Sequence, residues 1–376
     1  MLKLDIIAGA RPNFMKISPI IKQLNKYNAD HTSSAIEFRL IHTGQHYDQN
    51  MSGSFFNQLD IPEPDINLGA GSGTQAAQTA QIMIGYENAL AEWRPDVCIV
   101  VGDVNSTMAC SIVAKKAGVK VAHVEAGIRS GDWSMPEEIN RIVTDSITDY
   151  FFTTSEVANQ HLLNAGHKKD KIFYVGNTMI DSLLSHIHNL KQPEFYERML
   201  KEEKYIVLTL HRPANVDNSS QLSHLLRIIN DSAGDHTILF PIHPRTLKMY
   251  KMLDESFDKI KIVEPLGYLE FIFTIQHSVG VITDSGGITE ETSILNIPCI
   301  TLRDSTERPE TITLGTNELV SDSKLLGDFI NKMVAGNWKQ SQPIKLWDGR
   351  SAERIVEHLV QLNLEETLPG RIFRYG

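Results

Sequence analysis

The sequence predicts an α/β protein built from two Rossmann-like, doubly wound parallel-sheet domains. Short apolar runs typical of strands alternate with amphipathic runs typical of helices along the chain. Several apolar runs are solid rather than alternating, as expected for parallel strands covered by helices on both faces. The chain has 376 residues, which exceeds the usual size of one hydrophobic core, so two domains are expected.

The expected strands form two sets in chain order. The first set comprises Leu4–Ala8, Phe38–His42, Val97–Val101, Lys120–Val124, Tyr150–Thr153 and Ile172–Val175. The second comprises Tyr205–Leu210, Thr237–Pro241, Lys261–Val263, Gly280–Thr283 and Cys299–Leu302. Expected helices include Ser106–Ala117, Pro136–Ile147, Ser219–Ala233 and Leu269–Gln276. Repeated strand–helix units of this kind predict doubly wound parallel sheets.

A polar seam near Asn189–Lys204, rich in Lys and Glu, separates the two sets. We therefore expect an N-terminal Rossmann-like domain over residues 1–185, carrying the candidate catalytic carboxylates. A C-terminal Rossmann-like, nucleotide-binding domain is expected over residues 186–350. The segment 351–376 is expected to form a C-terminal helix and tail that could pack back on the N-terminal domain.

Composition excludes several classes of protein. Hydrophobic residues make up 41% and charged residues 22%, as in ordinary soluble proteins. The net charge of -10 argues against nonspecific nucleic-acid binding. No apolar run approaches the ~18 residues of a membrane span, and the first residues do not resemble a secretory signal. The three cysteines have neither metal-site nor disulfide spacing, which indicates a cytoplasmic protein.

The segment Asp284–Glu291 suggests a phosphate-binding turn. An apolar strand-like run precedes Ser285-Gly286-Gly287, and a helix-like run ending near Asn296 follows it. Unpaired N–H groups and the dipole at a helix start attract phosphate, and glycines permit close approach. Glu291, one turn into the helix, could reach the hydroxyls of a ribose. A serine N-cap followed by a tight turn would explain the same residues.

The end of the first expected strand carries two cations. Arg11 could bind a phosphate bidentately, and Lys16 adds a point charge. An exposed turn with solvated cations would account for them equally well.

Three carboxylates follow strands or open a helix in the first half. Asp103 and Glu125 each end an expected strand, so both are expected at one rim of the sheet. Asn105 or Ser106 would serve better than Asp103 as the cap of the next helix, which leaves Asp103 available. Glu137 follows Pro136 in the first turn of an expected helix, where capping explains it equally well.

In the second half, His211 follows a strand and could contact phosphate or carry a proton near neutral pH. Arg308 lies in a polar segment after the last expected strand and could return to the same rim. The sequence contains no zinc-type spacing, Walker A motif, G-x-G-x-x-G or G-x-S-x-G elbow. These residues indicate acid–base chemistry beside a nucleoside diphosphate, with no cofactor and no metal.

Over nearly its whole length the chain resembles the non-hydrolysing UDP-N-acetylglucosamine 2-epimerases. The matching motifs are Gly9-Ala10-Arg11-Pro12 with Lys16, Thr43-Gly44-Gln45-His46, Gly102-Asp103, His123-Val124-Glu125-Ala126-Gly127, Pro136-Glu137-Glu138 with Asn140-Arg141, His211-Arg212, Asp284-Ser285-Gly286-Gly287 with Glu290-Glu291, and Arg303-Asp304 with Thr306-Glu307-Arg308-Pro309. Each motif alone is weak, but a chance match of so many in order is improbable.

The resemblance implies a glycosyltransferase-B-like fold with a UDP-sugar in the cleft between the domains. It implies that Asp103, Glu125 and Glu137 line the sugar, with His211 near them and the diphosphate. The implied substrate-binding residues are Arg11, Lys16, Phe271 (near the uracil), Ser285, Gly286, Gly287, Glu291 (at the ribose) and Arg308.

The implied reaction is reversible C2 epimerisation of UDP-N-acetylglucosamine to UDP-N-acetylmannosamine, which feeds surface polysaccharide synthesis. UDP would be eliminated to give a 2-acetamidoglucal and then added back. Two groups on opposite faces of the ring and cations for the leaving UDP are needed, but no cofactor is. Which carboxylate is base and which is acid stays open. Among oligomers, a homodimer is expected.

Two departures from the family leave the regulation and the exact substrate open. Gln45 and His46 match a site of substrate activation, but residues 68–75 lack the arginine that accompanies it. The loop of residues 130–135 looks short, which suggests a modified sugar such as a 2,3-diacetamido uronic acid. A hydrolysing 2-epimerase, a UDP-sugar glycosyltransferase and a nucleotide-sugar sensor without catalysis are compatible with the same scaffold.

Overall fold

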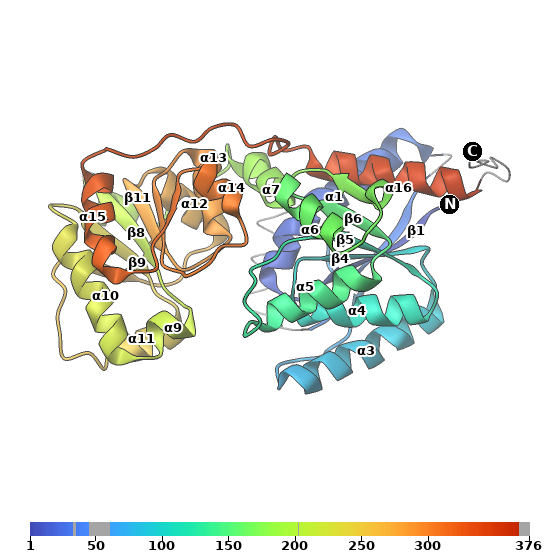
Figure 1. Cartoon of the computed structure of the whole chain (residues 1–376), viewed down its shortest axis with the longest axis horizontal. Helices are drawn as coiled ribbons and strands as arrows, with labels where there is room; N and C mark the ends of the chain where they lie inside the picture. The colour runs from blue at the N-terminus through green and yellow to red at the C-terminus, as the bar shows by residue number, and fades with distance from the viewer. Residues whose placement is uncertain (33–34, 45–60, 202, 368–376) are drawn as a thin grey trace. The chain divides into compact units, whose positions relative to one another are not determined.

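The structure is a computed structural model that describes residues 1–32, 35–44, 61–201 and 203–367. The chain divides into two compact units (Figure 1). Unit 1 comprises Met1–Ser185 and Lys345–Gly376, and unit 2 comprises His186–Ile344. Each unit has its own parallel sheet, because each contains its own run of strand–helix repeats.

The sheet of unit 1 has seven strands in the order β3-β2-β1-β4-β5-β6-β7. Every pairing in it is parallel. Its strands are β1 (Lys3–Ala8), β2 (Glu37–His42), β3 (Ile66–Asn67), β4 (Val97–Val101), β5 (Lys120–Val124), β6 (Tyr150–Thr153) and β7 (Ile172–Tyr174). The strand order reverses between β1 and β4. In doubly wound sheets, ligands bind outside the carboxyl ends of the strands at such a reversal.

Helices cover both faces of this sheet. They are α1 (Arg11–Asp30), α3 (Gln75–Glu92), α4 (Asn105–Lys116), α5 (Pro136–Ile147), α6 (Glu156–Asn164), η2 (Lys169–Lys171), α7 (Thr178–His186) and α16 (Ser351–Thr367). Figure 1 shows α3, α4 and α5 on one side of the sheet and α1 and α16 on the other. Strands covered on both faces must be apolar throughout, and β4 is accordingly fully buried.

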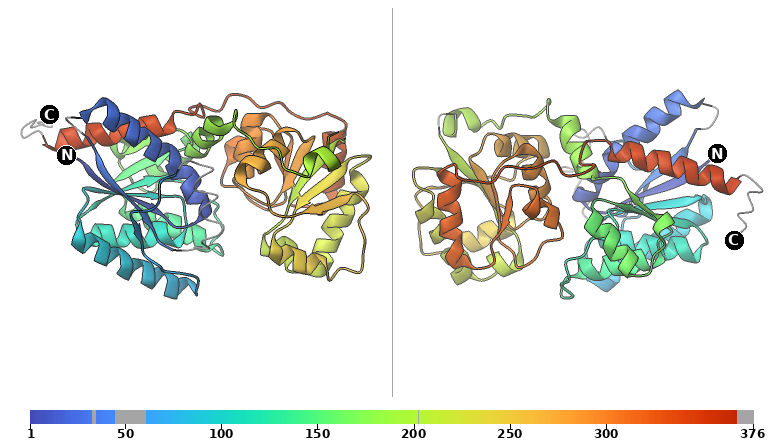
Figure 2. Two further views of the ribbon diagram at one scale, coloured as in Figure 1. Left: turned by 180° about the vertical axis from the view of Figure 1, so that it is seen from behind. Right: turned by 45° about the horizontal axis from the view of Figure 1, so that its top comes forward.

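The last helix returns to unit 1. Helix α16 packs along α1, and the two lie side by side in both views of Figure 2. The Asp181 carboxylate accepts hydrogen bonds from the backbone N–H groups of Ser351 (3.1 Å) and Ala352 (2.7 Å). The Trp347 indole N–H donates to the Thr154 carbonyl at 3.0 Å. A capped helix start and a buried indole therefore fix this segment to unit 1.

The sheet of unit 2 has six strands in the order β10-β9-β8-β11-β12-β13, again all parallel. The strands are β8 (Tyr205–Thr209), β9 (Thr237–Pro241), β10 (Ile260–Val263), β11 (Gly280–Thr283), β12 (Cys299–Thr301) and β13 (Asn317–Leu319). The helices are α8 (Tyr196–Met199), α9 (Pro213–Val216), α10 (Ser219–Ser232), α11 (Pro244–Tyr250), α12 (Tyr268–Gln276), α13 (Ile288–Leu295), α14 (Pro309–Thr313) and α15 (Ser323–Val334). The strand order reverses between β8 and β11, so a second candidate ligand edge lies there.

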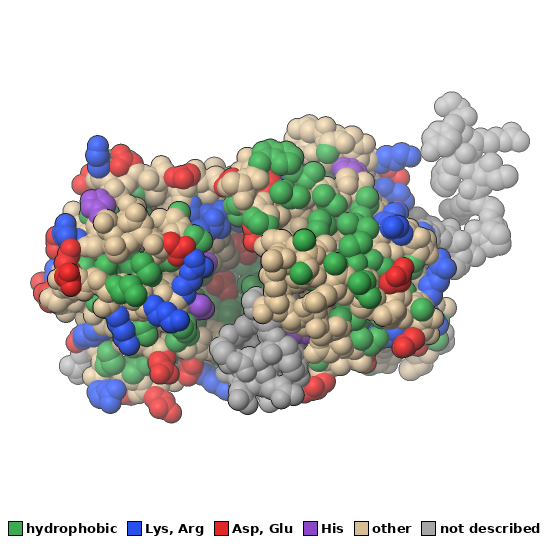
Figure 3. Space-filling view, turned by 90° about the horizontal axis from the view of Figure 1, so that it is seen from below, with side chains coloured by type: hydrophobic (Ala, Val, Ile, Leu, Met, Phe, Trp, Pro, Cys, Tyr) green, Lys and Arg blue, Asp and Glu red, His purple; other side chains and the backbone are tan. Residues whose placement is uncertain are grey.

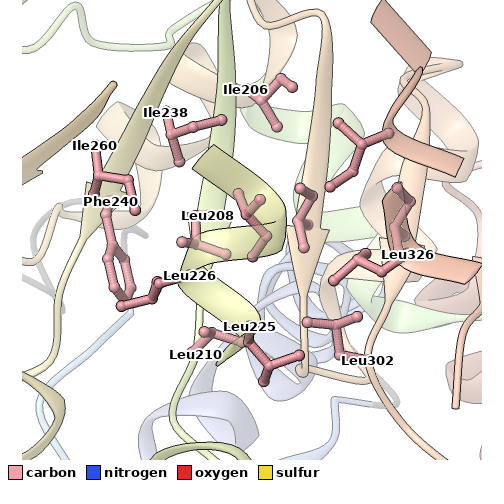
Figure 4. Close-up of a cluster of buried hydrophobic side chains, with 14 of the residues drawn as sticks. Ile206, Leu208, Leu210, Leu225, Leu226, Ile238, Phe240, Ile260, Leu302 and Leu326 are labelled. Atoms are coloured by element: carbon pink, nitrogen blue, oxygen red, sulfur yellow. The ribbon is translucent and has the colours of Figure 1, made fainter. Parts of the chain in front are cut away.

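A hydrophobic core holds the helices to each sheet. In unit 2, strand residues such as Ile206 and Leu208 pack against Leu226 of α10 and Leu326 of α15 (Figure 4). In unit 1, Tyr86 of α3 packs with residues of β4 and α4. These cores make the ends of the central strands a rigid base for polar side chains.

The predicted fold class of two Rossmann-like parallel-sheet domains is confirmed. Two short strands, β3 and β13, were not predicted. The expected caps were wrong: Asn105 and Ser106 lie inside α4, whose N-cap is Val104, with no side-chain cap. Asn105 donates instead to Gln75 (2.6 Å) and Gln78 (2.8 Å). The Asn105 side chain therefore bonds to α3 and does not cap α4.

Lys/Arg and Asp/Glu side chains are interspersed over the face drawn in Figure 3. Within the described part of the chain, no helix is both long and apolar enough to cross a membrane. Cys98, Cys110 and Cys299 are free and buried.

Candidate functional site

Asp103 lies in the turn that follows β4. Its Oδ2 accepts a hydrogen bond from Arg141 Nη2 at 2.5 Å, and its backbone carbonyl accepts one from Asn140 Nδ2 at 2.9 Å. Both donors come from α5. The side chain of Asp103 remains 26% exposed, so its carboxylate is held by a cation and is still accessible to a ligand.

Arg141 also ties this carboxylate to a loop. Its Nη1 donates to Glu138 Oε2 at 2.8 Å. Glu138 accepts hydrogen bonds from the backbone N–H groups of Ser130 (2.9 Å) and Gly131 (3.1 Å). Burial alone would raise the pKa of Glu138, but these hydrogen bonds and the Arg141 cation lower it. The loop that precedes α5 is therefore fixed to the group that holds Asp103.

Glu125, after β5, combines burial, strain and a cation. Its φ of 72° lies in the left-handed region, which costs a residue with a Cβ about 1 kcal/mol. Its backbone N–H donates to Phe152 at 2.9 Å. Lys16 Nζ of α1 lies 2.6 Å from Glu125 Oε2. The side chains are 14% and 9% exposed, so the pair is largely removed from water.

Lys16 also lies against the turn after β4. A Cβ on Gly102 would lie 3.3 Å from Lys16 Nζ, and Gly102 has a φ of 68°. Glycine is needed here both for the left-handed backbone and for the space. The ammonium therefore lies beside the ends of β4 and β5, and the structure brings Lys16 to Glu125.

Glu137 and Arg11 lie at helix starts. Glu137 follows Pro136 in the first turn of α5 and is half-buried, four residues before Arg141. Arg11 is the first residue of α1. Asn13 caps that helix by accepting from the N–H groups of Gly9 (3.2 Å) and Ala10 (2.9 Å). The capping role considered for Glu137 stays compatible with its position.

In unit 2, His211 and Asp284 form a pair at the strand reversal. His211 follows β8 and Asp284 follows β11, and His211 Nδ1 lies 2.8 Å from Asp284 Oδ1. Asp284 is fully buried, whereas the His211 side chain is 52% exposed. Asp284 Oδ2 also accepts hydrogen bonds from the backbone N–H groups of His211 (3.0 Å) and Arg212 (2.9 Å) and from the Asn215 amide (3.1 Å).

This arrangement fixes the electrostatics of the pair. Burial alone would raise the pKa of Asp284, but the hydrogen bond from His211 and those from Arg212 and Asn215 lower it. An ionised Asp284 orients the imidazole through Nδ1. His211 Nε2 therefore belongs to an oriented, exposed ring that can donate to an anion or carry a proton.

The Ser285-Gly286-Gly287 turn connects β11 to α13. The N-cap of α13 is Gly287, so the interpretation of Ser285 as the N-cap was wrong. The Ser285 N–H donates to Thr283 Oγ1 at 3.0 Å. A Cβ on Gly286 would lie 3.1 Å from Arg303 Nη1, whereas a Cβ on Gly287 would meet nothing within 4 Å. The position next to Gly287 is therefore open at the start of the helix, where unpaired N–H groups lie.

Glu291 of α13 is a buried carboxylate beside Tyr268 of α12. Burial raises the pKa of Glu291 to about 8, the Tyr268 hydroxyl opposes the rise, and the neighbouring Glu290 adds to it. Phe271 is half-buried and lies three residues after Tyr268 on the same helix. Residues at this spacing share a helix face, so Phe271 lies on the face that carries Tyr268.

Arg308, the N-cap of α14, forms an ion pair with Glu290. Both side chains are buried, at 7% and 3% exposed. The neighbouring pair Arg303–Glu307 is bidentate, with both N–O distances at 2.7 Å. Arg308 therefore reaches α13, as predicted for a segment that returns to this edge of the sheet.

The sequence missed the partners that hold these groups. Arg141, Glu138, Glu290 and Asp284 lie in the motifs that match the family. The sequence did not indicate that they hold the candidate site residues. Asp103 follows β4 and Asp284 follows β11, and each strand lies where the strand order of its sheet reverses. This shared position is the signal that could have identified Asp284. Gln45 and His46 lie outside the described residues. No group of three or more His, Cys, Asp or Glu among the described residues is arranged to hold a metal ion.

The fold has two parallel-sheet α/β units; carboxylates with cationic partners follow strands of one sheet, and a His–Asp pair and a glycine-rich helix start follow strands of the other. The family model "UDP-N-acetylglucosamine 2-epimerase" matches residues 28–360. The chain belongs to this family of epimerases, which are isomerases.

Two known proteins and one solved structure illustrate the relationship. The UDP-N-acetylglucosamine 2-epimerase of Methanocaldococcus jannaschii is 44% identical over 95% of this chain and 99% of its own. The UDP-2,3-diacetamido-2,3-dideoxy-D-glucuronate 2-epimerase of Pseudomonas aeruginosa is 36% identical over 96% of this chain and 100% of its own. The crystal structure of the M. jannaschii enzyme in complex with UDP-GlcNAc and UDP covers 96% of this chain and 100% of its own, with a TM-score of 0.84 and 43% identity.

Proposed function

We propose that the protein catalyses the reversible C2 epimerisation of UDP-N-acetylglucosamine to UDP-N-acetylmannosamine. The observation that carries the proposal is Glu125, a mostly buried carboxylate in a left-handed conformation, paired with Lys16 at 2.6 Å. Backbone strain at a polar residue is retained where surrounding contacts enforce it, and it clusters at functional sites. Asp103 lies at the end of the neighbouring strand, so proton-transfer groups converge on this edge.

The reaction proceeds by elimination and re-addition. A base removes the C2 proton while the C1–O bond to UDP breaks, which forms a 2-acetamidoglucal with a C1–C2 double bond. UDP then adds back to C1, and an acid delivers a proton to C2 from the opposite face. Substrate and product are isomers, so no electrons are gained or lost. The rate depends on two oppositely placed proton carriers and on stabilisation of the leaving UDP.

The groups of unit 1 supply the proton carriers in this proposal. Asp103, Glu125 and Glu137 are the candidates for base and acid. Lys16 offsets the charge of Glu125, and Arg141 offsets the charge of Asp103. Without these cations, neighbouring carboxylates would raise each other's pKa and favour protonation. The direction of the reaction exchanges the roles of base and acid, so one residue serves as each in turn.

The groups of unit 2 hold UDP. The N–H groups at the start of α13 and the exposed ring of His211 donate to the diphosphate. Arg308 adds positive charge, as do Arg11 and Lys16 of unit 1, and Glu291 accepts hydrogen bonds from the ribose hydroxyls. Phe271 lies near the uracil. A dipole and donors fixed before the reaction stabilise the diphosphate charge as the C1–O bond breaks.

A modified sugar is the second candidate substrate. The P. aeruginosa relative is 36% identical and its name specifies a 2,3-diacetamido uronic acid. Glu138 fixes the loop of residues 130–135, and Arg141 links Glu138 to Asp103. This loop is therefore where the protein would distinguish the modified sugar.

A panel of UDP-hexosamines tests the proposal. The purified protein is incubated with UDP-N-acetylglucosamine, UDP-N-acetylmannosamine and UDP-2,3-diacetamido glucuronate, and the products are identified by NMR. We expect interconversion of the first two without an acceptor. Turnover of the diacetamido sugar alone would establish the second candidate. Release of free N-acetylmannosamine would identify a hydrolysing epimerase. Turnover only with an added sugar acceptor would identify a transferase, and binding without turnover would identify a sensor.

We further propose that the enzyme acts in the cytoplasm as a homodimer and supplies an activated sugar for surface polysaccharides. Sedimentation equilibrium measures the dimer directly. A monomer at micromolar concentrations would contradict it.

A further inference from the structure

We propose that His123 is a positioning residue that joins the two strand ends bearing Asp103 and Glu125. This inference rests on the proposed function, because it concerns the residues to which that function assigns proton transfer. His123 lies in β5 and is completely buried. Its side chain contacts neither Asp103 nor Glu125 in any hydrogen bond of the described residues, so its effect on the reaction would pass through the backbone.

Both ring nitrogens of His123 have hydrogen-bond partners that can only accept. Nε2 lies 2.8 Å from the carbonyl oxygen of Gly102, and Nδ1 lies 2.7 Å from Asp145 Oδ1. A carbonyl has no hydrogen to donate, so Nε2 must carry one. Burial alone would raise the pKa of Asp145, but His123 and Arg129 outweigh burial and lower it, so Asp145 is an acceptor too. Nε2 therefore donates to the Gly102 carbonyl, and Nδ1 faces the Asp145 carboxylate.

The first of these bonds fixes the turn that presents Asp103. Gly102 has a left-handed backbone with a φ of 68°, and its N–H donates to the Val124 carbonyl at 3.1 Å. The Gly102 carbonyl is the acceptor for His123, and Asp103 is the next residue. Loss of this bond would free the peptide that orients the Asp103 side chain.

The second bond fixes the segment after Glu125. Asp145 Oδ2 accepts from the N–H of Gly127 at 3.1 Å and lies 2.7 Å from Arg129 Nη1. A Cβ on Gly127 would lie 2.4 Å from the carbonyl oxygen of Ala158, so this segment has no room to shift toward α6. His123 and Asp145 thus connect the turn before Asp103 to the turn after Glu125.

A buried network that links the two ends predicts an effect on the chemical step. Displacement of a reacting group by ~1 Å costs on the order of 100-fold in rate. None of His123, Gly102, Gly127 and Asp145 is among the residues to which UDP binding is assigned. The network therefore acts on kcat with little change in the affinity for UDP.

Glutamine and asparagine separate the two bonds of His123. The amide nitrogen of glutamine is three bonds from Cβ, as is Nε2 of histidine. The amide nitrogen of asparagine is two bonds from Cβ, as is Nδ1. His123→Gln is expected to keep the donation to Gly102, and His123→Asn to keep only the donation to Asp145. Each substitution keeps one of the two hydrogen bonds and removes the other, so the variants form a matched pair.

The experiment measures kcat, the Kd for UDP and amide hydrogen exchange for the wild type and both variants. We expect His123→Asn to lower kcat on the order of 100-fold and to raise exchange at residues 102–105, with the Kd for UDP unchanged. His123→Gln should retain kcat within about tenfold of the wild type. Equal kcat losses in the two variants, or a loss of UDP affinity that matches the loss of kcat, would overturn the proposal.

Arg129→Gln tests the same network from its exposed side if neither His123 variant folds. It removes the ion pair with Asp145 and leaves His123 in place. We expect a several-fold lower kcat with unchanged UDP affinity, and an unchanged kcat would overturn the proposal. An inactive wild type would instead contradict the proposed function, while the exchange data would still report on the network.

Discussion

Lys16 Nζ lies 2.6 Å from Glu125 Oε2, and the two side chains are 14% and 9% exposed. The pair links α1 to the left-handed residue that ends β5. Lys16 is expected at the diphosphate and Glu125 at the sugar. A cation and a candidate proton carrier are therefore in direct contact at the ends of the strands.

Lys16→Met should cost about 3 kcal/mol in the free energy of unfolding, because it leaves the Glu125 carboxylate largely buried without its cation. Turnover should fall as well. Urea unfolding and the initial rate measure the two effects. Lys26→Met, an exposed lysine of the same helix, is the matched control and should change stability by less than about 0.5 kcal/mol. Wild-type stability in Lys16→Met would show that the pair contributes little.

Asp103→Asn and Glu137→Gln should each lower kcat by about 100-fold or more and leave the affinity for UDP within about twofold. Both substitutions keep the size of the side chain and remove its ability to transfer a proton. Steady-state kinetics and calorimetric titration with UDP give the two quantities. Glu156→Gln, at an exposed carboxylate, is the control. Parallel losses of kcat and UDP affinity would argue against the division of roles between the units.

Arg308→Ala should weaken UDP binding by at least about tenfold and destabilise the fold, because Glu290 is left buried without its partner. The double variant Arg308→Ala with Glu290→Gln removes the uncompensated charge. It should recover most of the stability but not the UDP affinity. Recovery of both in the double variant would show that Arg308 serves the fold rather than the ligand.

Glu291 should make the fold less stable as pH rises from ~4.3 to about 8. Burial raises the folded-state pKa of Glu291 to about 8, against ~4.3 for an unfolded glutamate. In that window the folded state binds more protons than the unfolded state, so stability falls with increasing pH. Denaturant unfolding of the wild type and of Glu291→Gln measures the difference. It should grow with pH by a few kcal/mol in favour of the variant, and a difference independent of pH would contradict the buried-acid interpretation.

The sequence was sufficient where local pattern and burial act together. The solid apolar run at Val97–Val101 must be covered on both faces, and it forms β4 with those bounds. Pro136 opens α5 because its missing N–H and fixed φ suit the first helical position. The short strands Ile66–Asn67 and Asn317–Leu319 were missed because they have too few residues to show a period.

The sequence predicted where the candidate site residues lie on the sheets, but not which side chains contact them. The rule that polar residues follow central strands identified Asp103, Glu125 and His211. Their partners Arg141, Lys16 and Asp284 depend on how helices and neighbouring strands pack, which one sequence does not specify. The predicted capping roles of Asn105 and Ser285 were also wrong, because Asn105 bonds to α3 and the N-cap of α13 is Gly287. Assignments of individual residues to substrate remain predictions.

In the proposed reaction the C2–H bond breaks and re-forms with a proton from solvent. Incubation of the wild type with UDP-N-acetylglucosamine in heavy water, followed by proton NMR, tests it most directly. We predict that UDP-N-acetylmannosamine appears with deuterium at C2 and that the remaining substrate also exchanges at C2. Formation of the manno epimer with its C2 hydrogen retained, or no epimer at all, would contradict the account.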